Sequence, residues 1–120
     1  MRRAYDAFSR GDFDTAIEIA HPDIEFVPPG GAIKGRAALR AWAEPDAMED
    51  QRILPLEFHV NGSKVLVRQN TRARGASTGI ELDTDTWAVW TFDDDGLATR
   101  LDAFLIQEEG EAREAAGLPA

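Results

Sequence analysis

The chain has 120 residues, of which 43% are hydrophobic and 29% are charged, and its formal net charge is −9. This composition is typical of one folded domain, and the excess of acid argues against a nucleic-acid partner, because phosphate binding depends on clustered Lys and Arg. There is no cysteine, which excludes disulfides and Cys-ligated metals, and no apolar run is long enough to span a membrane. We therefore expect a single domain over residues 1–120 that is cytoplasmic, with neither a nucleic-acid nor a membrane partner and with no cofactor.

Two helices are predicted at the start of the chain. Apolar residues at helical spacing predict a helix over residues 2–10, and Asp12 is a natural N-cap for a second one. His21 precedes a proline, which disfavours helical backbone, so the second helix is expected to end there. The apolar stripe of that helix consists of Phe13, Ala16, Ile17 and Ala20.

The next fifty residues alternate between strand and helix signals. Residues 23–27 predict a short strand and residues 35–43 a third helix, followed by an irregular stretch over 44–51. Residues 52–60 alternate again and predict a strand in which Pro55 marks a bulge or an edge position.

The stretch from Lys64 to Leu105 predicts three long antiparallel strands joined by two tight turns. Asn61-Gly62 predicts a hairpin leading into it, and residues 108–116 predict a short closing helix. Helices followed by a meander of strands indicate an α+β fold in which the N-terminal helices cover one face of a curved antiparallel sheet.

The meander separates charged from apolar side chains. If residues 75–78 form the turn, Arg68 lies opposite Asp85 and Arg72 opposite Glu81 on one face, as expected of a solvated surface. The other face is apolar with a few neutral hydrogen-bonding groups, which suits a small hydrophobic ligand. With Trp42 from the third helix, the predicted pocket-lining residues are Leu54, Leu56, Phe58, Val67, Gln69, Thr71, Leu82, Thr84, Thr86, Ala88, Trp90, Leu101 and Ala103.

Three segments carry a resemblance to a known family: RRAYDAFSRGDFDTAIEIAHPDIEF, IKGRAALRAW and WTFDDDG followed by RLDAF and EAAGL. They resemble the nuclear transport factor 2-like superfamily, and within it the SnoaL-like group related to polyketide cyclases and ketosteroid isomerases. The resemblance covers nearly the whole chain. It implies a cone-shaped barrel, a pocket between helices and sheet, and commonly a homodimer, but it does not fix the function.

The catalytic positions of these relatives hold other residues here. The resemblance aligns the tyrosine and the two acids of the steroid isomerases with Ala4, Pro28 and Ala88. The histidine and aspartate of the polyketide cyclases align near Ala88 and with Ala103. Tyr5 and Asp102 each lie one residue away from such a position, so they are the candidate catalytic residues.

Three functions remain open. The first is a protein of unassigned activity that binds a small hydrophobic molecule in a pocket without the usual catalytic acids. The second is an isomerase, cyclase or hydratase acting on a cyclic hydrophobic substrate, with Asp102 as base and Tyr5, Gln69 or Thr86 orienting the substrate. The third is a structural or interaction domain whose pocket is filled by its own side chains.

The predicted register turns Asp102 outward, near Trp87. The apolar residues Trp87, Val89 and Phe104 on that convex face are expected to form a homodimer interface. Asp83, Asp85 and the aspartates of the 93–96 turn do not match a metal-binding pattern, and no metal is expected.

Overall fold

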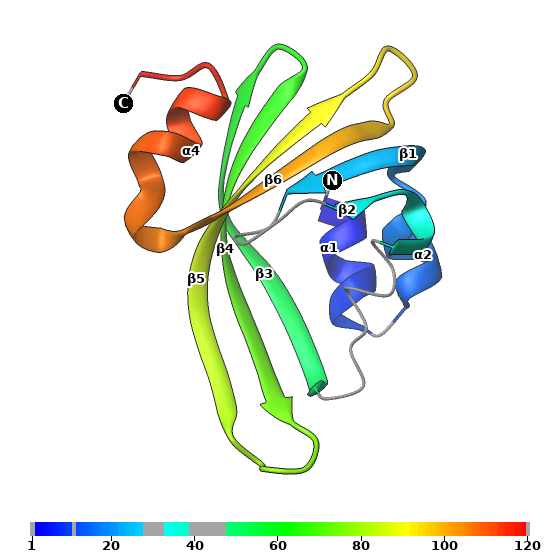
Figure 1. Cartoon of the computed structure of the whole chain (residues 1–120), viewed down its shortest axis with the longest axis vertical. Coiled ribbons are helices and arrows are strands. Elements are labelled where there is room, and N and C mark those ends of the chain that lie inside the picture. The colour runs from blue at the N-terminus through cyan, green and yellow to red at the C-terminus, as the bar shows by residue number, and fades with distance from the viewer. Residues whose placement is uncertain (1, 11, 28–32, 39–47, 120) are drawn as a thin grey trace.

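The fold is a strongly curved six-stranded sheet with helices on both sides (Figure 1). The computed structural model describes residues 2–10, 12–27, 33–38 and 48–119. The strand order is β2-β1-β6-β5-β4-β3, and every neighbouring pair is antiparallel except β1 and β6, which run parallel. The expected α+β class is therefore confirmed, with a mixed rather than purely antiparallel sheet. The elements are α1 (Arg2–Ser9), α2 (Phe13–Ile17), β1 (Ala20–Val27), β2 (Ile33–Lys34), β3 (Met48–Asn61), β4 (Lys64–Gly75), β5 (Glu81–Phe92), β6 (Ala98–Leu105), η1 (Ile106–Glu108) and α4 (Glu109–Ala115).

The second helix is shorter than its apolar stripe predicts. Asp12 caps it as expected, its carboxylate accepting from the backbone N–H of Thr15 at 3.2 Å. The helix ends at Ile17, however, and β1 begins at Ala20, which pairs with Ala98 of β6. Backbone pairing with a distant strand prevails over local helical spacing, so the predicted end at His21 is wrong.

The other boundaries that shift lie around the third helix. Residues 36–38 are helical, and the remainder of the predicted helix over 35–43 lies outside the described residues. The irregular stretch predicted over 44–51 is wrong from Met48 onward, where β3 begins.

The two faces of β4 and β5 are those that the alternation predicts, although the register differs. Arg72 pairs with Asp83 and Arg68 with Trp87, two residues away from the predicted partners. Side chains alternate with a period of two, so a shift of two residues leaves every side chain on its predicted face. We call the face carrying Val67, Gln69, Thr86, Ala88 and Trp90 the inner face, and the face carrying Leu66, Arg68, Trp87, Val89 and Asp102 the outer face.

A β-bulge in β3 changes the face of one predicted pocket residue. Phe58 pairs with Val67 on the inner face, but the register shifts between Pro55 and Glu57, and Leu54 then lies opposite Asn70. The extra residue reverses the alternation upstream of the bulge. The prediction that Leu54 shares the inner face is therefore wrong. Leu56 occupies the bulge and is 51% exposed.

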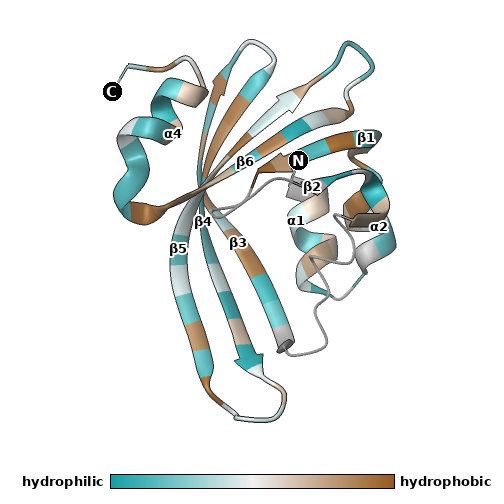
Figure 2. Cartoon of the chain, in the orientation of Figure 1, coloured by the Kyte–Doolittle hydropathy of each residue, from teal (hydrophilic) through white to brown (hydrophobic). Residues whose placement is uncertain are grey.

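Hydrophobic residues are buried on both faces of the sheet. Figure 2 shows hydrophobic and hydrophilic segments alternating along β5. One cluster lies at β1, β6 and β5 and includes Ile24, Phe26, Ala88 and Leu101. A second cluster lies on the outer face under α4. Among the helices of the described residues, none is long and apolar enough to cross a membrane.

The C-terminal helix covers the apolar patch of the outer face. Trp87 and Val89 are 2% and 1% exposed and pack with Ala112 of α4, and Phe104 packs against the same cluster. The indole N–H of Trp87 donates to the carbonyl of Ile106 at 3.1 Å. A helix of the same chain thus covers Trp87 and Val89, whereas Phe104 stays partly exposed, and the expected homodimer remains a prediction.

Two polar side chains of the hairpin at the end of β3 help to hold α4. Asn61 donates to the carbonyls of Ala116 and Gly117, and the Lys64 ammonium donates to the carbonyl of Ala115 at 2.9 Å. These bonds satisfy carbonyl groups at the C-terminal end of the helix, where a cation is also favoured by the helix dipole.

Replacing Ala112 with glutamine tests this docking. Ala112 is fully buried, so Ala112→Gln forces a larger polar side chain against Trp87 and should lower the free energy of unfolding by about 1–3 kcal/mol. Urea unfolding followed by tryptophan fluorescence measures this. The control Glu111→Gln changes the exposed neighbouring position and should leave the midpoint unchanged; equal midpoints for the two variants would contradict the docking.

Candidate functional site

A chain of neutral hydrogen bonds joins α1 to the inner face of the sheet. The Tyr5 hydroxyl donates to Gln69 Oε1 at 2.7 Å and accepts from the indole N–H of Trp90 at 3.0 Å. Gln69 Nε2 in turn donates to the Thr86 hydroxyl oxygen at 3.2 Å. Four side chains from one helix and two strands thus form a connected polar group within an apolar surface.

Aromatic packing fixes the position of Tyr5. Its ring makes edge-to-face contacts with Phe58 and Trp90, with centroid distances of 6.4 and 6.2 Å. A second link from α1 holds the helix against β3, since the Ser9 hydroxyl bonds both the N–H and the carbonyl of Ile53. Tyr5 is consequently held at both its ring and its hydroxyl.

The Tyr5 phenol is a poor proton donor to a substrate. Burial raises the pKa of Tyr5 well above its ordinary value, and the bond from Trp90 offsets this only in part. Its single hydrogen is already donated to Gln69. Tyr5 therefore acts here as a neutral group that positions the Gln69 amide.

Two hydrogen-bond donors of the chain remain for a ligand. The Gln69 amide has a second N–H, and the Thr86 hydroxyl, which accepts from Gln69, keeps its own hydrogen; the described residues supply no acceptor for either. Both groups are partly exposed. The arrangement suits recognition of a carbonyl or hydroxyl oxygen on an otherwise apolar molecule.

Most of the predicted pocket residues share the inner face, but they differ in exposure. Val67, Ala88 and Leu101 are buried, and the last two pack in the cluster with Ile24 and Phe26, so they support the face rather than offer contact surface. Toward the far end of the strands Leu82 is 44% exposed, and Thr84 is exposed beside it. The partly exposed members are Phe58, Gln69, Thr71, Thr86, Trp90 and Ala103.

Three predicted positions are not part of this group. Leu54 and Leu56 are displaced by the bulge in β3, and Ile53 takes the inner position opposite Thr71. Trp42, like Pro28, lies outside the described residues. The sequence did not predict that Ile53 lies on the inner face or that Ser9 bonds its backbone. Both contacts depend on the position of the bulge, which the alternation of residues does not reveal.

Asp102 lies on the outer face, as the alternation predicts, although it pairs with Val89 rather than lying beside Trp87. Its two carboxylate oxygens accept from Arg100 Nε at 3.0 and 2.9 Å, and Arg100 also approaches Glu25 at 3.8 Å. The hydrogen bond and the negative charge of Asp102 raise the pKa of the Arg100 guanidinium, as expected of an ion pair. This position separates the carboxylate from Tyr5, Gln69 and Thr86 by the thickness of the sheet.

The described part of the inner face has no obvious acid, base or metal ligand. Every inner-face position of β4, β5 and β6 in the described structure is apolar or carries a neutral polar group. His59 and Glu57 lie on the outer face and contact each other at 3.2 Å. Within residues 2–10, 12–27, 33–38 and 48–119, no three His, Asp or Glu side chains gather as a metal site would require.

The family model and the solved structures that match this chain point to the same protein family. The model of the SnoaL-like domain matches residues 1–101, which leaves the end of β6 and α4 beyond the match. No curated protein matches the sequence.

Several solved structures share the fold. The crystal structure of TerC co-crystallised with polyporic acid is 27% identical over 94% of both chains, with a TM-score of 0.74. A putative polyketide cyclase from Sinorhizobium meliloti is 27% identical, with 84% of this chain and 89% of that chain covered and a TM-score of 0.69. An NTF2-like protein of unknown function from Exiguobacterium is 20% identical, with 86% and 94% covered and a TM-score of 0.76.

The buried phenol generates a test in alkaline solution. Tyr5 is the only tyrosine, so absorbance at 295 nm reports it alone. Because folding raises its pKa, the stability it contributes is complete below the ordinary value of about 10 and declines as the pH rises above it. We expect phenolate to appear only together with unfolding, and in urea to appear near pH 10; ionisation near pH 10 with an unchanged circular dichroism spectrum would contradict the buried position.

Proposed function

This chain belongs to the SnoaL-like domain family, and we propose that it binds a small, largely apolar molecule against the inner face of its sheet. The observation that carries the proposal is the neutral group formed by Trp90, Tyr5, Gln69 and Thr86 on an otherwise apolar surface. Apolar contact supplies most of the binding free energy in such a site, and a few polar groups set the orientation of the ligand. TerC, which was co-crystallised with polyporic acid, supports the choice of a small organic ligand.

The oriented donors favour a ligand with at least one oxygen acceptor. The Gln69 amide is fixed by Tyr5 on its oxygen and by Thr86 on one hydrogen, so its second N–H has a defined direction. Pre-arranged donors lose little conformational entropy on binding. A carbonyl or ether oxygen attached to an apolar skeleton fits this requirement.

An isomerase, cyclase or hydratase acting on a cyclic substrate is the second candidate. The putative polyketide cyclase at 27% identity favours it. In this hypothesis Asp102 is the base, yet its ion pair with Arg100 lies on the opposite face from the oriented donors. A base must reach the proton that it removes at about 2.6–3.2 Å, so the geometry favours binding over catalysis by Asp102.

Homodimerisation and a cytoplasmic location remain proposals. The absence of cysteine is compatible with a reducing compartment. A dimer would have to use a surface other than Trp87 and Val89, since α4 covers both. Analytical ultracentrifugation of the purified chain measures the oligomeric state directly.

Ligand binding is tested first with polyporic acid and a panel of apolar cyclic ketones and quinones, after mass spectrometry of any molecule that co-purifies. We expect at least one compound to bind saturably and to raise the melting temperature. Thr86→Val removes the hydroxyl while keeping the side-chain shape, and should weaken binding by about 5- to 30-fold, the equivalent of roughly 1–2 kcal/mol.

The matched control is Thr91→Val, which makes the same change on the outer face of the same strand. Thr91→Val should bind the ligand with the same affinity as the parent protein. We expect the same affinity for Asp102→Asn. Equal losses in Thr86→Val and Thr91→Val would refute the proposed site. Unchanged affinity in Asp102→Asn combined with loss of turnover would instead support the enzyme hypothesis.

A further inference from the structure

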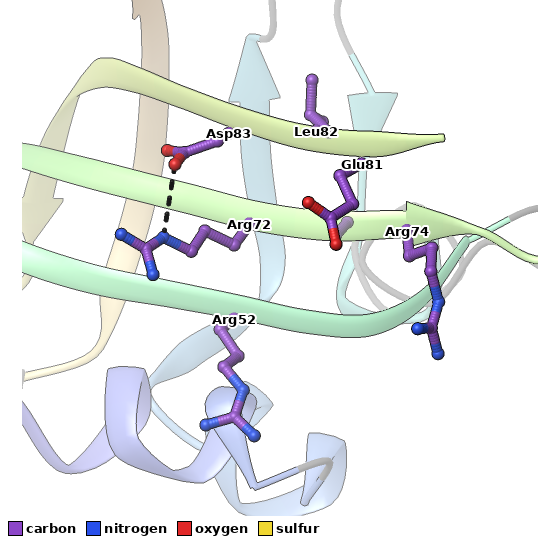
Figure 3. A pocket seen from close by; sticks show the side chains of 7 residues that line it. Arg52, Arg72, Arg74, Glu81, Leu82 and Asp83 are labelled. Atoms are coloured by element: carbon purple, nitrogen blue, oxygen red, sulfur yellow. Dashed lines mark ion pairs between the residues drawn. The ribbon is translucent and has the colours of Figure 1, made fainter. Parts of the chain in front are cut away.

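A concave site lies at the far end of β3, β4 and β5, and Tyr5 is not among its lining residues. It has a volume of about 390 Å³, and it is lined by Arg52, Arg72, Ala73, Arg74, Glu81, Leu82 and Asp83 (Figure 3). Its charged residues have the outer-face parity, whereas Ala73 and Leu82 belong to the inner face at the end of the strands. We call it the arginine groove.

The groove carries more positive than negative charge. Three arginines face two carboxylates there, while the whole chain has a net charge of −9. Arg72 Nε lies 3.5 Å from Asp83 Oδ2 and donates to Asn70 Oδ1 at 3.2 Å, and Arg74 pairs across the strands with Glu81. Asp83 therefore compensates for Arg72, and the three cations of the groove exceed its two acids by one.

Arg52 is the cation of the groove that no described acid pairs with. It lies directly opposite Arg72 in the pairing of β3 with β4. Like charges in this position are destabilising. Among the described residues, Arg52 has neither a hydrogen-bond nor an ion-pair partner, so no ion pair fixes its guanidinium, which extends away from Arg72 (Figure 3).

We propose that the arginine groove binds a small oxyanion, the carboxylate or phosphate group of a soluble metabolite, between Arg52 and Arg72. The terminal nitrogen atoms of both guanidinium groups are available, since only Nε of Arg72 is engaged with described residues. A planar guanidinium presents paired N–H groups that match the two oxygens of a carboxylate or phosphate. One bound anion also neutralises the single positive charge by which the three arginines exceed Glu81 and Asp83.

The two carboxylates limit what the groove accepts. Glu81 and Asp83 border it on the β5 side, and they repel any ligand with many negative charges. A nucleic acid or another polyanion is disfavoured for this reason as well as by the net charge of the chain. The inference does not rest on the inner-face ligand, because none of Tyr5, Gln69, Thr86 and Trp90 lines the groove.

The test is a titration of the purified chain with inorganic phosphate, and separately with acetate, at constant pH and ionic strength. Chemical shifts of the arginine Nε–Hε groups are recorded by NMR. We expect saturable shifts of Arg52 and Arg72 with a midpoint in the millimolar range, because Arg72 is well exposed (62%) and its interactions are screened. Saturation by both anions indicates a general oxyanion site, and saturation by phosphate alone indicates a phosphate site.

Two substitutions complete the experiment. Arg52→Gln removes the uncompensated cation and should abolish the saturable shift at Arg72, and Arg72→Gln should abolish it at Arg52. The control Arg113→Gln changes an arginine that pairs with Glu109 at 2.8 Å on α4, and it should leave the titration unchanged. Shifts that stay linear for both anions, or that persist in Arg52→Gln, would overturn the proposal.

Discussion

The Tyr5 hydroxyl joins the N-terminal helix to the middle of the sheet through polar contact, and Ser9 adds a second link at β3. It donates to Gln69 of β4 and accepts from Trp90 of β5, so one atom ties three elements together. The hydroxyl is buried, and losing either partner would leave a polar atom unsatisfied away from water, which is costly. Burial keeps the phenol neutral, and its bond to Gln69 Oε1 leaves the Gln69 Nε2 group to donate to Thr86. The properties of the inner face thus depend on the requirement that this one hydroxyl be satisfied.

The outer face is organised by a different element. The closing helix buries Trp87 and Val89 and accepts hydrogen bonds from Asn61 and Lys64 through its last carbonyls. This helix lies beyond the part of the chain that matches the family model. Its docking converts an apolar surface of the sheet into a second hydrophobic cluster. Beyond the helix, the outer face carries paired charges, and at its far end the arginine groove.

Charge is therefore segregated by the sheet. Along β4, β5 and β6, ionisable side chains lie on the outer face, where Arg68 pairs with Asp85 and Arg100 with Asp102. Asn70 and Arg68 also hold the pKa of Asp85 below its ordinary value. The inner face of these strands keeps neutral groups only. This separation favours recognition of an uncharged ligand inside and leaves proton transfer by Asp102 on the wrong side of the sheet.

The sequence by itself determined the faces of β4, β5 and β6, because alternation is a local property with a period of two. The predicted registers were two residues off, yet Asp102 and Gln69 kept their faces, since an even shift preserves the parity. Only the tertiary structure placed the bulge at Leu56, which reversed Leu54 and brought Ile53 inward. It alone also brought α4 onto Trp87 and Tyr5 onto Gln69. Trp87 and Ala112 of α4 are 25 positions apart (112 − 87), and Tyr5 and Gln69 are 64 apart. Contacts over such separations depend on how whole elements pack, which no local pattern of residues encodes.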